Sequence, residues 1–111
     1  MKPIPKHLLI HSAKAVKLSE PDTWNNRTDE KVTGLNNVRI EPSNALTITK
    51  DNRQVKVSAV LFFDCVISKP SGFDFSDVDV IEALGNRYEI IAIDKLYDEK
   101  KLHHYEVGLC L

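Results

Sequence analysis

The side chains of this sequence that could carry out chemistry are its histidines, its cysteines and one group of aspartates. His103 and His104 are adjacent on an expected strand, where successive side chains point to opposite faces. The two rings should therefore not chelate one ion together. His104 and Glu106 do share a face, but two ligands fall short of a metal site. We predict that the histidines bind no metal.

The aspartates and cysteines give no stronger sign of a reaction. Asp74, Asp77 and Asp79 lack the ligand spacing and the glycine of a calcium loop, so they should solvate a turn. Cys65 and Cys110 lie in apolar stretches, without the basic neighbours that lower a thiol pKa. We expect both thiols to be reduced, with a disulfide between them as the alternative.

Other signatures of catalysis are also missing from the sequence. There is no GxSxG motif, and the 4 glycines are too dispersed to form a loop that holds phosphate groups. We therefore predict that the protein is not an enzyme and needs no cofactor.

Size and composition point to one small globular domain over residues 1–111. The chain is 42% hydrophobic and 28% charged, which is enough apolar surface for a modest core. Its net charge of -1 lacks the basic excess that is typical of proteins bound to nucleic acid. The apolar run Leu8-Leu9-Ile10 is too short to span a membrane, so we expect a cytosolic protein at synthesis.

Strand patterns dominate the chain, and the clearest runs from residue 55 to residue 68. The apolar residues at its odd positions are Val55, Val57, Ala59, Leu61, Phe63, Cys65 and Ile67. As one strand this segment would be roughly 40 Å long, far above the usual strand length. It should therefore bend, bulge or project towards a neighbouring molecule.

Further strands are expected at residues 8–18, 38–42, 46–49, 78–84, 88–96 and 102–110, joined by turns at 51–52, 69–72, 85–86 and 97–100. In the first of these strands, Leu8, Ile10, Val16 and Leu18 should share the buried face. The predicted fold is all-β, a small barrel or sandwich of about seven antiparallel strands with at most one short helix. Residues 1–6 should be a flexible N-terminus, and residues 19–33 a long loop.

Two regions are candidates for contact with other proteins. The long loop holds Trp24, Asn25, Asn26 and Arg27, and an aromatic residue in a polar loop is often an energetic hot spot of an interface. The alternative is that Trp24 folds back over the open end of the barrel. On the strand, Val60 and Phe62 lie on the face that is apolar only near its centre.

Several segments together resemble the minor capsid protein family of tailed bacteriophages and prophages of Gram-positive bacteria. They are Ile10-His11-Ser12-Ala13-Lys14, Val38-Arg39-Ile40-Glu41-Pro42-Ser43, Ala59-Val60-Leu61-Phe62-Phe63-Asp64, Ser68-Lys69-Pro70 and the run from Leu96 to Val107. The stretch from Phe75 to Ile91 is also similar to small β-barrels that join phage heads to tails.

The resemblance implies a structural protein of the virion, a minor capsid or head–tail connector protein that acts by assembly. Its partners would be further copies of itself in a ring, a dodecamer being one option, together with portal or adaptor and tail proteins. It implies only weak contact with DNA in a channel, and residence in the host cytoplasm during assembly.

A barrel that binds single-stranded nucleic acid, in the manner of an OB-fold, is the alternative function. Such a barrel needs surface aromatic residues between basic ones on one sheet face. The sequence offers Phe62, Phe63 and Tyr105, which lie mostly on apolar strands. A connector role is therefore the leading expectation.

Overall fold

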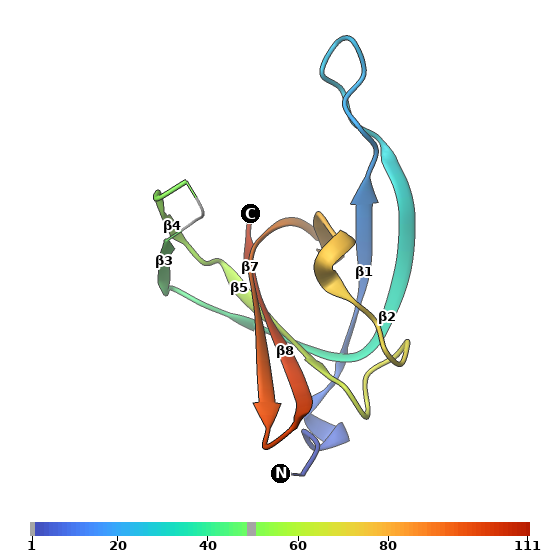
Figure 1. The fold of residues 1–111 in the computed structure, drawn as a ribbon, viewed down its shortest axis with the longest axis vertical. Coiled ribbons are helices and arrows are strands. Elements are labelled where there is room, and N and C mark those ends of the chain that lie inside the picture. Colours follow the sequence, from blue (N-terminus) through green and yellow to red (C-terminus); the bar gives the residue numbers. More distant parts are fainter. Residues whose placement is uncertain (1, 49–50) are drawn as a thin grey trace.

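Six antiparallel strands close into a barrel in the computed structural model, which describes residues 2–48 and 51–111 (Figure 1). The strands are β1 (His11–Leu18), β2 (Asp29–Pro42), β3 (Leu46–Ile48), β4 (Gln54–Lys56), β5 (Ala59–Asp64), β6 (Val80–Ala83), β7 (Asn86–Asp98) and β8 (Lys101–Cys110). The barrel order is β1-β2-β5-β8-β7-β6, and β6 pairs again with β1. Strands β3 and β4 form a separate two-stranded ribbon. The predicted all-β class is confirmed, and two 3-10 turns, η1 (Lys6–Leu8) and η2 (Phe75–Asp77), are the helical elements of the described residues.

The barrel is filled by alternate residues of its strands, as period-two patterning predicts. The buried core consists of Ala13, Ala15, Leu35, Val38, Ile40, Ala59, Leu61, Phe63, Phe75, Ile81, Ala83, Tyr88, Tyr105, Val107 and Leu109. At its centre the fully buried ring of Phe75 lies 5.5 Å from that of Phe63 and 5.1 Å from that of Tyr105, measured between centroids. The turn η2 therefore acts as a plug that carries an aromatic ring into the barrel.

The first predicted strand begins later than expected, and its buried face is different. Residues 6–8 form η1, and β1 starts only at His11. The register with β2 shifts between His11 and Ala13, which marks a bulge. The extra residue of this bulge lies on β2, which covers Leu35 to Val38 while β1 covers only His11 to Ala13. Burial in β1 alternates without a break from His11 to Ala15, so Ala13 and Ala15 are buried whereas Ile10, before the strand, is 66% exposed. The predicted buried face of Leu8, Ile10, Val16 and Leu18 is therefore wrong except at Val16.

The overlong strand predicted for residues 55–68 is in fact two strands and a turn. It is interrupted at Val57 and Ser58, whose backbone groups bond to the connection between β2 and β3. It ends at Asp64, where the carboxylate accepts the N–H groups of Val66 and Ile67 and so starts a turn. The prediction of one strand was wrong because the apolar alternation continues across both breaks, whereas the hydrogen bonds between strands stop there.

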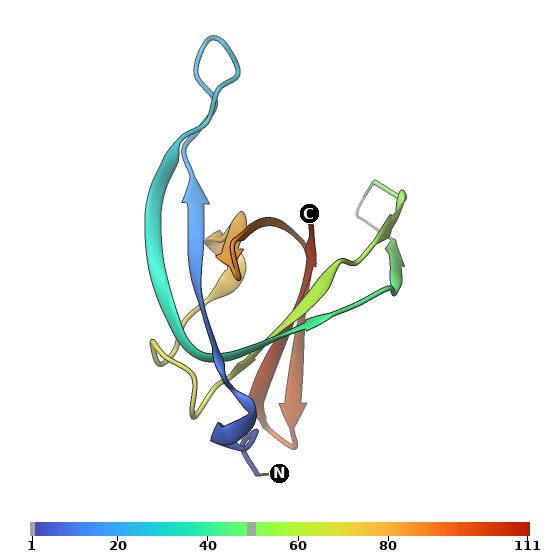
Figure 2. The ribbon, with the colours of Figure 1, turned by 180° about the vertical axis from the view of Figure 1, so that it is seen from behind.

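The long loop predicted for residues 19–33 is largely a β-hairpin. Strand β2 starts at Asp29, and its exposed first residues pair with β1, for example Lys31 with Lys17. The polar side chains of this segment suggested a loop. Pairing between strands requires only hydrogen bonds between backbone groups, so a strand can form without an apolar face that packs against the core. The remaining loop projects at one end of the molecule's 48 Å long axis, and the N-terminus lies at the other end (Figures 1 and 2).

The other turns match their predicted places closely. The β6–β7 turn uses Leu84 and Gly85 at φ 52° and 77°, one residue before the predicted pair. Positive φ at both central residues is the geometry of a type I′ hairpin, which matches the twist of its strands. The β7–β8 turn falls at residues 99–100, inside the predicted range. The predicted end of β3 at Thr49 lies outside the described residues.

Candidate protein-interaction site

Trp24 stands at the tip of the β1–β2 hairpin with 83% of its surface exposed. The alternative that it folds back over the barrel is therefore wrong. One carboxylate oxygen of Asp22 accepts the backbone N–H groups of Trp24 and Asn26, at 2.8 and 2.9 Å. Asn25, with φ 61°, adopts the left-handed conformation that asparagine tolerates. The loop is thus a compact, hydrogen-bonded turn that holds a large apolar side chain in solvent.

The base of this hairpin is tied to the barrel by Arg27. Its Nε donates to the carbonyl of Ser19 at 2.8 Å, and its Nη2 lies 3.8 Å from a carboxylate oxygen of Asp79. The same Asp79 oxygen accepts the N–H of Leu18. Arg27 therefore fixes the direction of the loop, in addition to being a candidate contact residue.

At the other end of the molecule, an apolar groove surrounds Phe62. Ile4 and Leu8 of the N-terminal segment supply its further apolar walls, and its volume is about 410 Å³. Its rim consists of Arg39, Glu41 and His104. We call these six residues the Phe62 groove.

The rim side chains of the Phe62 groove are paired with their neighbours. Arg39 Nε donates to Glu41 at 2.6 Å, and Arg39 Nη1 donates to the carbonyl of Leu8 at 3.0 Å. His104 Nε2 lies 2.9 Å from a carboxylate oxygen of Glu106. These contacts hold the rim in place around the apolar floor.

The N-terminal wall of the groove is held by a fully buried carboxylate. Oδ2 of Asp64 accepts the N–H of Ile4 at 2.8 Å, while Oδ1 accepts those of Val66 and Ile67. The carbonyl of Lys2 lies 2.6 Å from Nε2 of His103. The segment that follows Met1 is therefore attached to the barrel at two points, Asp64 and His103. The flexibility expected for residues 1–6 stays a prediction.

The two adjacent histidines do not point to opposite faces as predicted. Nδ1 of His103 lies 2.7 Å from Nδ1 of His104, and their ring centroids are 4.9 Å apart. The register between β7 and β8 shifts here, so His103 is the extra residue of a bulge. A bulge redirects side chains and breaks strict alternation, which explains the error.

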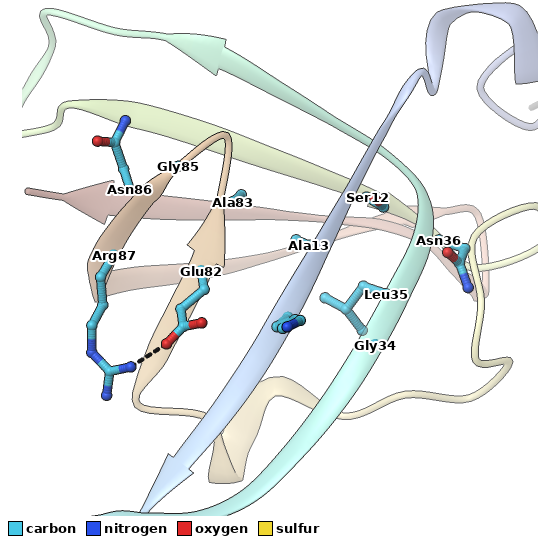
Figure 3. Close-up of a pocket in the computed structure, with 11 residues that line it drawn as sticks. Ser12, Ala13, Gly34, Leu35, Asn36, Glu82, Ala83, Gly85, Asn86 and Arg87 are labelled. Atoms are coloured by element: carbon cyan, nitrogen blue, oxygen red, sulfur yellow. Dashed lines mark hydrogen bonds and ion pairs between the residues drawn. The ribbon is translucent and has the colours of Figure 1, made fainter.

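A second, more polar hollow of about 610 Å³ lies between β1, β2 and the β6–β7 hairpin (Figure 3). Its charged wall is Arg87, which pairs with Glu82 and, at 2.8 Å, with Asp29. The hydrogen bond to Asp29 is the main cause that raises the pKa of Arg87 further above its usual value. A guanidinium between two carboxylates holds the strands together. The lining also contains the hydroxyl of Ser12 and the amine of Lys14.

Within the described ranges, no three His, Cys, Asp or Glu side chains gather as metal ligands. Both cysteines are free thiols. Burial, and secondly the charge of Asp64, raises the pKa of Cys65. Asp74 caps η2 by accepting the N–H of Ser76, which lowers the pKa of Asp74. These groups are structural parts of the turns around the barrel.

The aromatic platform needed by a nucleic-acid-binding barrel is not on the surface. Phe63 and Tyr105 are only 1% and 6% exposed, because both belong to the core. Of the aromatic residues considered for stacking, Phe62 alone is half-exposed. The structure thus gives this alternative little support.

The predicted contact residues fall into separate places. Trp24, Asn25, Asn26 and Arg27 are together in the hairpin loop, whereas Phe62 lines the groove at the opposite end. Val60 lies in a third, smaller hollow beside Ala45 and Gly108.

The remaining residues of the Phe62 groove were missed from the sequence. Ile4 lies between two prolines outside any strand pattern, and Leu8 was expected on the buried face of the first strand. No pattern in the sequence placed either residue beside Phe62. Leu46 and Ile48 of the β3–β4 ribbon, 61% and 68% exposed, were likewise not expected on the surface.

The fold and the site define a small closed β-barrel whose prominent surface features are a projecting hairpin and an apolar groove. The chain belongs to the minor capsid protein family, whose model matches residues 5–109. It is therefore a structural virion protein by family, and this family is not one of enzymes. No curated protein and no solved structure matches the chain. None of the helical turns in the described part is long or apolar enough to cross a bilayer.

Proposed function

We propose that this minor capsid protein is a head–tail connector, or head completion protein, of a tailed bacteriophage. It assembles as a ring at the portal vertex and contacts portal or adaptor proteins on one side and tail proteins on the other. This location in the particle follows assembly in the host cytoplasm. The family membership supports a virion role, and the exposed apolar surfaces of the barrel support a role in protein assembly.

The observation that carries the proposal is the projecting β1–β2 hairpin. A tryptophan that is 83% exposed leaves a large apolar surface in contact with water. Backbone hydrogen bonds to Asp22 hold this residue at the tip. An aromatic side chain on a rigid turn is suited to enter a pocket of a partner, because little backbone entropy is lost on binding.

The net charge of -1 agrees with partners that are proteins. A ring through which DNA passes needs only weak contact with phosphates, since strong neutralisation of the backbone would hold the DNA in place. The mixed charges of the barrel surface, paired as in Arg87 with Asp29, fit this role.

The test is a phage carrying a nonsense mutation in this gene. We expect DNA-filled heads and free tails that do not join, and cryo-electron microscopy of wild-type particles should place the chain below the portal. Empty or misshapen heads, or density on the capsid shell, would instead show a different capsid role.

A point variant tests the hairpin within the same assay. Trp24→Ala should reduce the yield of joined particles, whereas Tyr97→Ala is the matched control because Tyr97 is also exposed, at 60%, but lies on β7. The loop deletion should span residues 21–26 only, because residues from Asp29 onwards belong to β2.

A further inference from the structure

The chain carries a projecting indole at one end and an apolar groove at the other. The hairpin tip (residues 20–27) and the Phe62 groove lie at opposite ends of the long axis, as the loop and the N-terminal segment in Figures 1 and 2 show. A knob and a hole on opposite ends of one molecule are the requirement for a heterologous, head-to-tail contact between copies.

The backbone that carries the indole is held in a fixed turn. Besides the two hydrogen bonds to Asp22, the loop ends are clamped where Ser19 N–H donates to the carbonyl of Thr28 at 2.7 Å. Arg27 adds its hydrogen bond to Ser19. Little further ordering of the backbone is needed when Trp24 is buried, which lowers the entropy cost of binding.

The Phe62 groove has the shape and chemistry to receive an aromatic ring. Its floor is Phe62, with the side chains of Ile4 and Leu8 at its walls, and its volume of about 410 Å³ is larger than an indole side chain. The guanidinium of Arg39 is held at the rim by Glu41 and by the carbonyl of Leu8. A cation fixed beside an apolar floor can stack on the face of a docked tryptophan.

The charges of the two ends are complementary. Residues 1–19 contain no Asp or Glu, and Lys2 and Lys6 are exposed in the segment that forms the groove wall. The tip carries Glu20 and Asp22 on either side of Pro21, close to Trp24. Acidic groups beside the knob and basic groups beside the hole favour this pairing and disfavour tip-to-tip contact.

We propose that Trp24 of one copy docks into the Phe62 groove of the next copy of this chain. Each subunit then uses its tip once and its groove once, so the contact repeats and closes into a ring when the rotation between copies allows it. This inference rests on the proposed connector function and names the partner of the hairpin, which is the neighbouring subunit.

The test uses two variants that each remove one half of the contact. Trp24→Ala removes the knob, and Leu8→Asp places a charge in the hole at a side chain that is 40% exposed. Each variant alone should associate at least about thirty-fold more weakly than wild type, as expected for an interface hot spot. Tyr97→Ala and Ile10→Asp are the matched controls, since both residues are exposed and neither lines the groove.

Mixing the two variants gives the decisive readout by analytical ultracentrifugation. The intact tip of Leu8→Asp fits the intact groove of Trp24→Ala, while the other two ends are blocked. The mixture should therefore form a one-to-one heterodimer and nothing larger, whereas wild type continues to larger assemblies.

Three results would overturn the proposal. They are a wild type that stays monomeric up to millimolar concentration, a Leu8→Asp variant that associates like wild type, and a mixture that stays monomeric. If any of these occurs while microscopy still places the chain at the junction, the connector role stands and the tip binds a different protein. Density on the capsid shell with a one-to-one heterodimer in the mixture would remove the connector role and leave the self-contact intact.

Discussion

The buried carboxylate of Asp64 is the place where one substitution should affect both the fold and the groove. Asp64 is fully buried, and its two oxygens accept three backbone N–H groups, those of Ile4, Val66 and Ile67. One oxygen starts the turn after β5, and the other holds the N-terminal wall of the groove. Asp64→Ala removes all three acceptors at once.

The expected magnitude follows from the number of lost hydrogen bonds. A hydrogen bond to a charged acceptor contributes about 1.5 kcal/mol net, so three bonds give a loss of about 4–5 kcal/mol in the free energy of unfolding. Asp64→Asn keeps one carbonyl oxygen, which can still accept from Val66 and Ile67 at the position of Oδ1. It loses the bond to Ile4 and weakens the other two, a loss of about 2–3 kcal/mol.

Urea unfolding followed by circular dichroism measures these differences, with Asp77→Asn as the control on an exposed side chain of η2. The control should stay within about 0.5 kcal/mol of wild type. Amide exchange at Ile4 should accelerate in Asp64→Asn, because its acceptor is gone. A loss below 1 kcal/mol for Asp64→Ala would show that water replaces the carboxylate and would refute this reasoning.

Three further predictions concern the core and the titrating groups. Phe75→Leu should lower the free energy of unfolding by about 2 kcal/mol and Phe75→Ala by about 4 kcal/mol, because the fully buried ring contacts three other aromatic rings. Thermal or urea unfolding measures both losses. Equal losses for the two variants would mean that the barrel collapses around the site. Hydrogen bonds from Ser76 depress the pKa of Asp74 below 3.8, so its stabilisation is complete above that pH and is lost as the pH falls through the lowered value. The urea midpoints of wild type and Asp74→Asn should therefore differ at pH 7 and converge in strong acid, and a constant difference would contradict the cap. Burial raises the pKa of the Cys65 thiol, so in a Cys110→Ser background iodoacetamide should alkylate the folded protein more slowly at pH 8 than the urea-unfolded protein; equal rates would mean that Cys65 is open to solvent.

Much of the barrel could be predicted because its buried strands alternate in polarity. The odd residues of β5 from Ala59 to Phe63 are buried, as are Tyr105, Val107 and Leu109 of β8. Turns with Gly85 and Gly72 were also visible, since positive φ favours glycine. Where a pleated surface faces the core, period two is a reliable guide to the fold.

The errors have physical origins in small buried residues, in a bulge and in a strand segment without a buried apolar face. The buried face of β1 includes the small residues Ala13 and Ala15, so the larger Ile10 and Leu18 suggested the wrong face. A bulge at His103 brought two histidine rings together. Residues 29–33 pair with β1 without burying an apolar side chain, so side-chain polarity suggested a loop. Hydrogen bonding of the backbone leaves no trace in a hydropathy pattern.

The candidate site was half predictable for a related reason. Trp24 stood out because a large aromatic residue in a polar stretch is unusual. The groove around Phe62 joins side chains from residues 4 to 104, which only the closed barrel brings together. Composition identifies a single anchor, whereas a concave surface depends on the tertiary structure.

The strand pairs that close the barrel differ in length. Strand β6 meets β1 through three residue pairs, from Lys14 with Glu82 to Val16 with Val80, whereas β5 meets β8 through six. Local opening begins where the fewest hydrogen bonds must break, so deuterium should enter β6 and the facing part of β1 first. A capsid protein subunit built in this way can open along one side of the barrel while β5 and β8 keep the rest of the barrel folded.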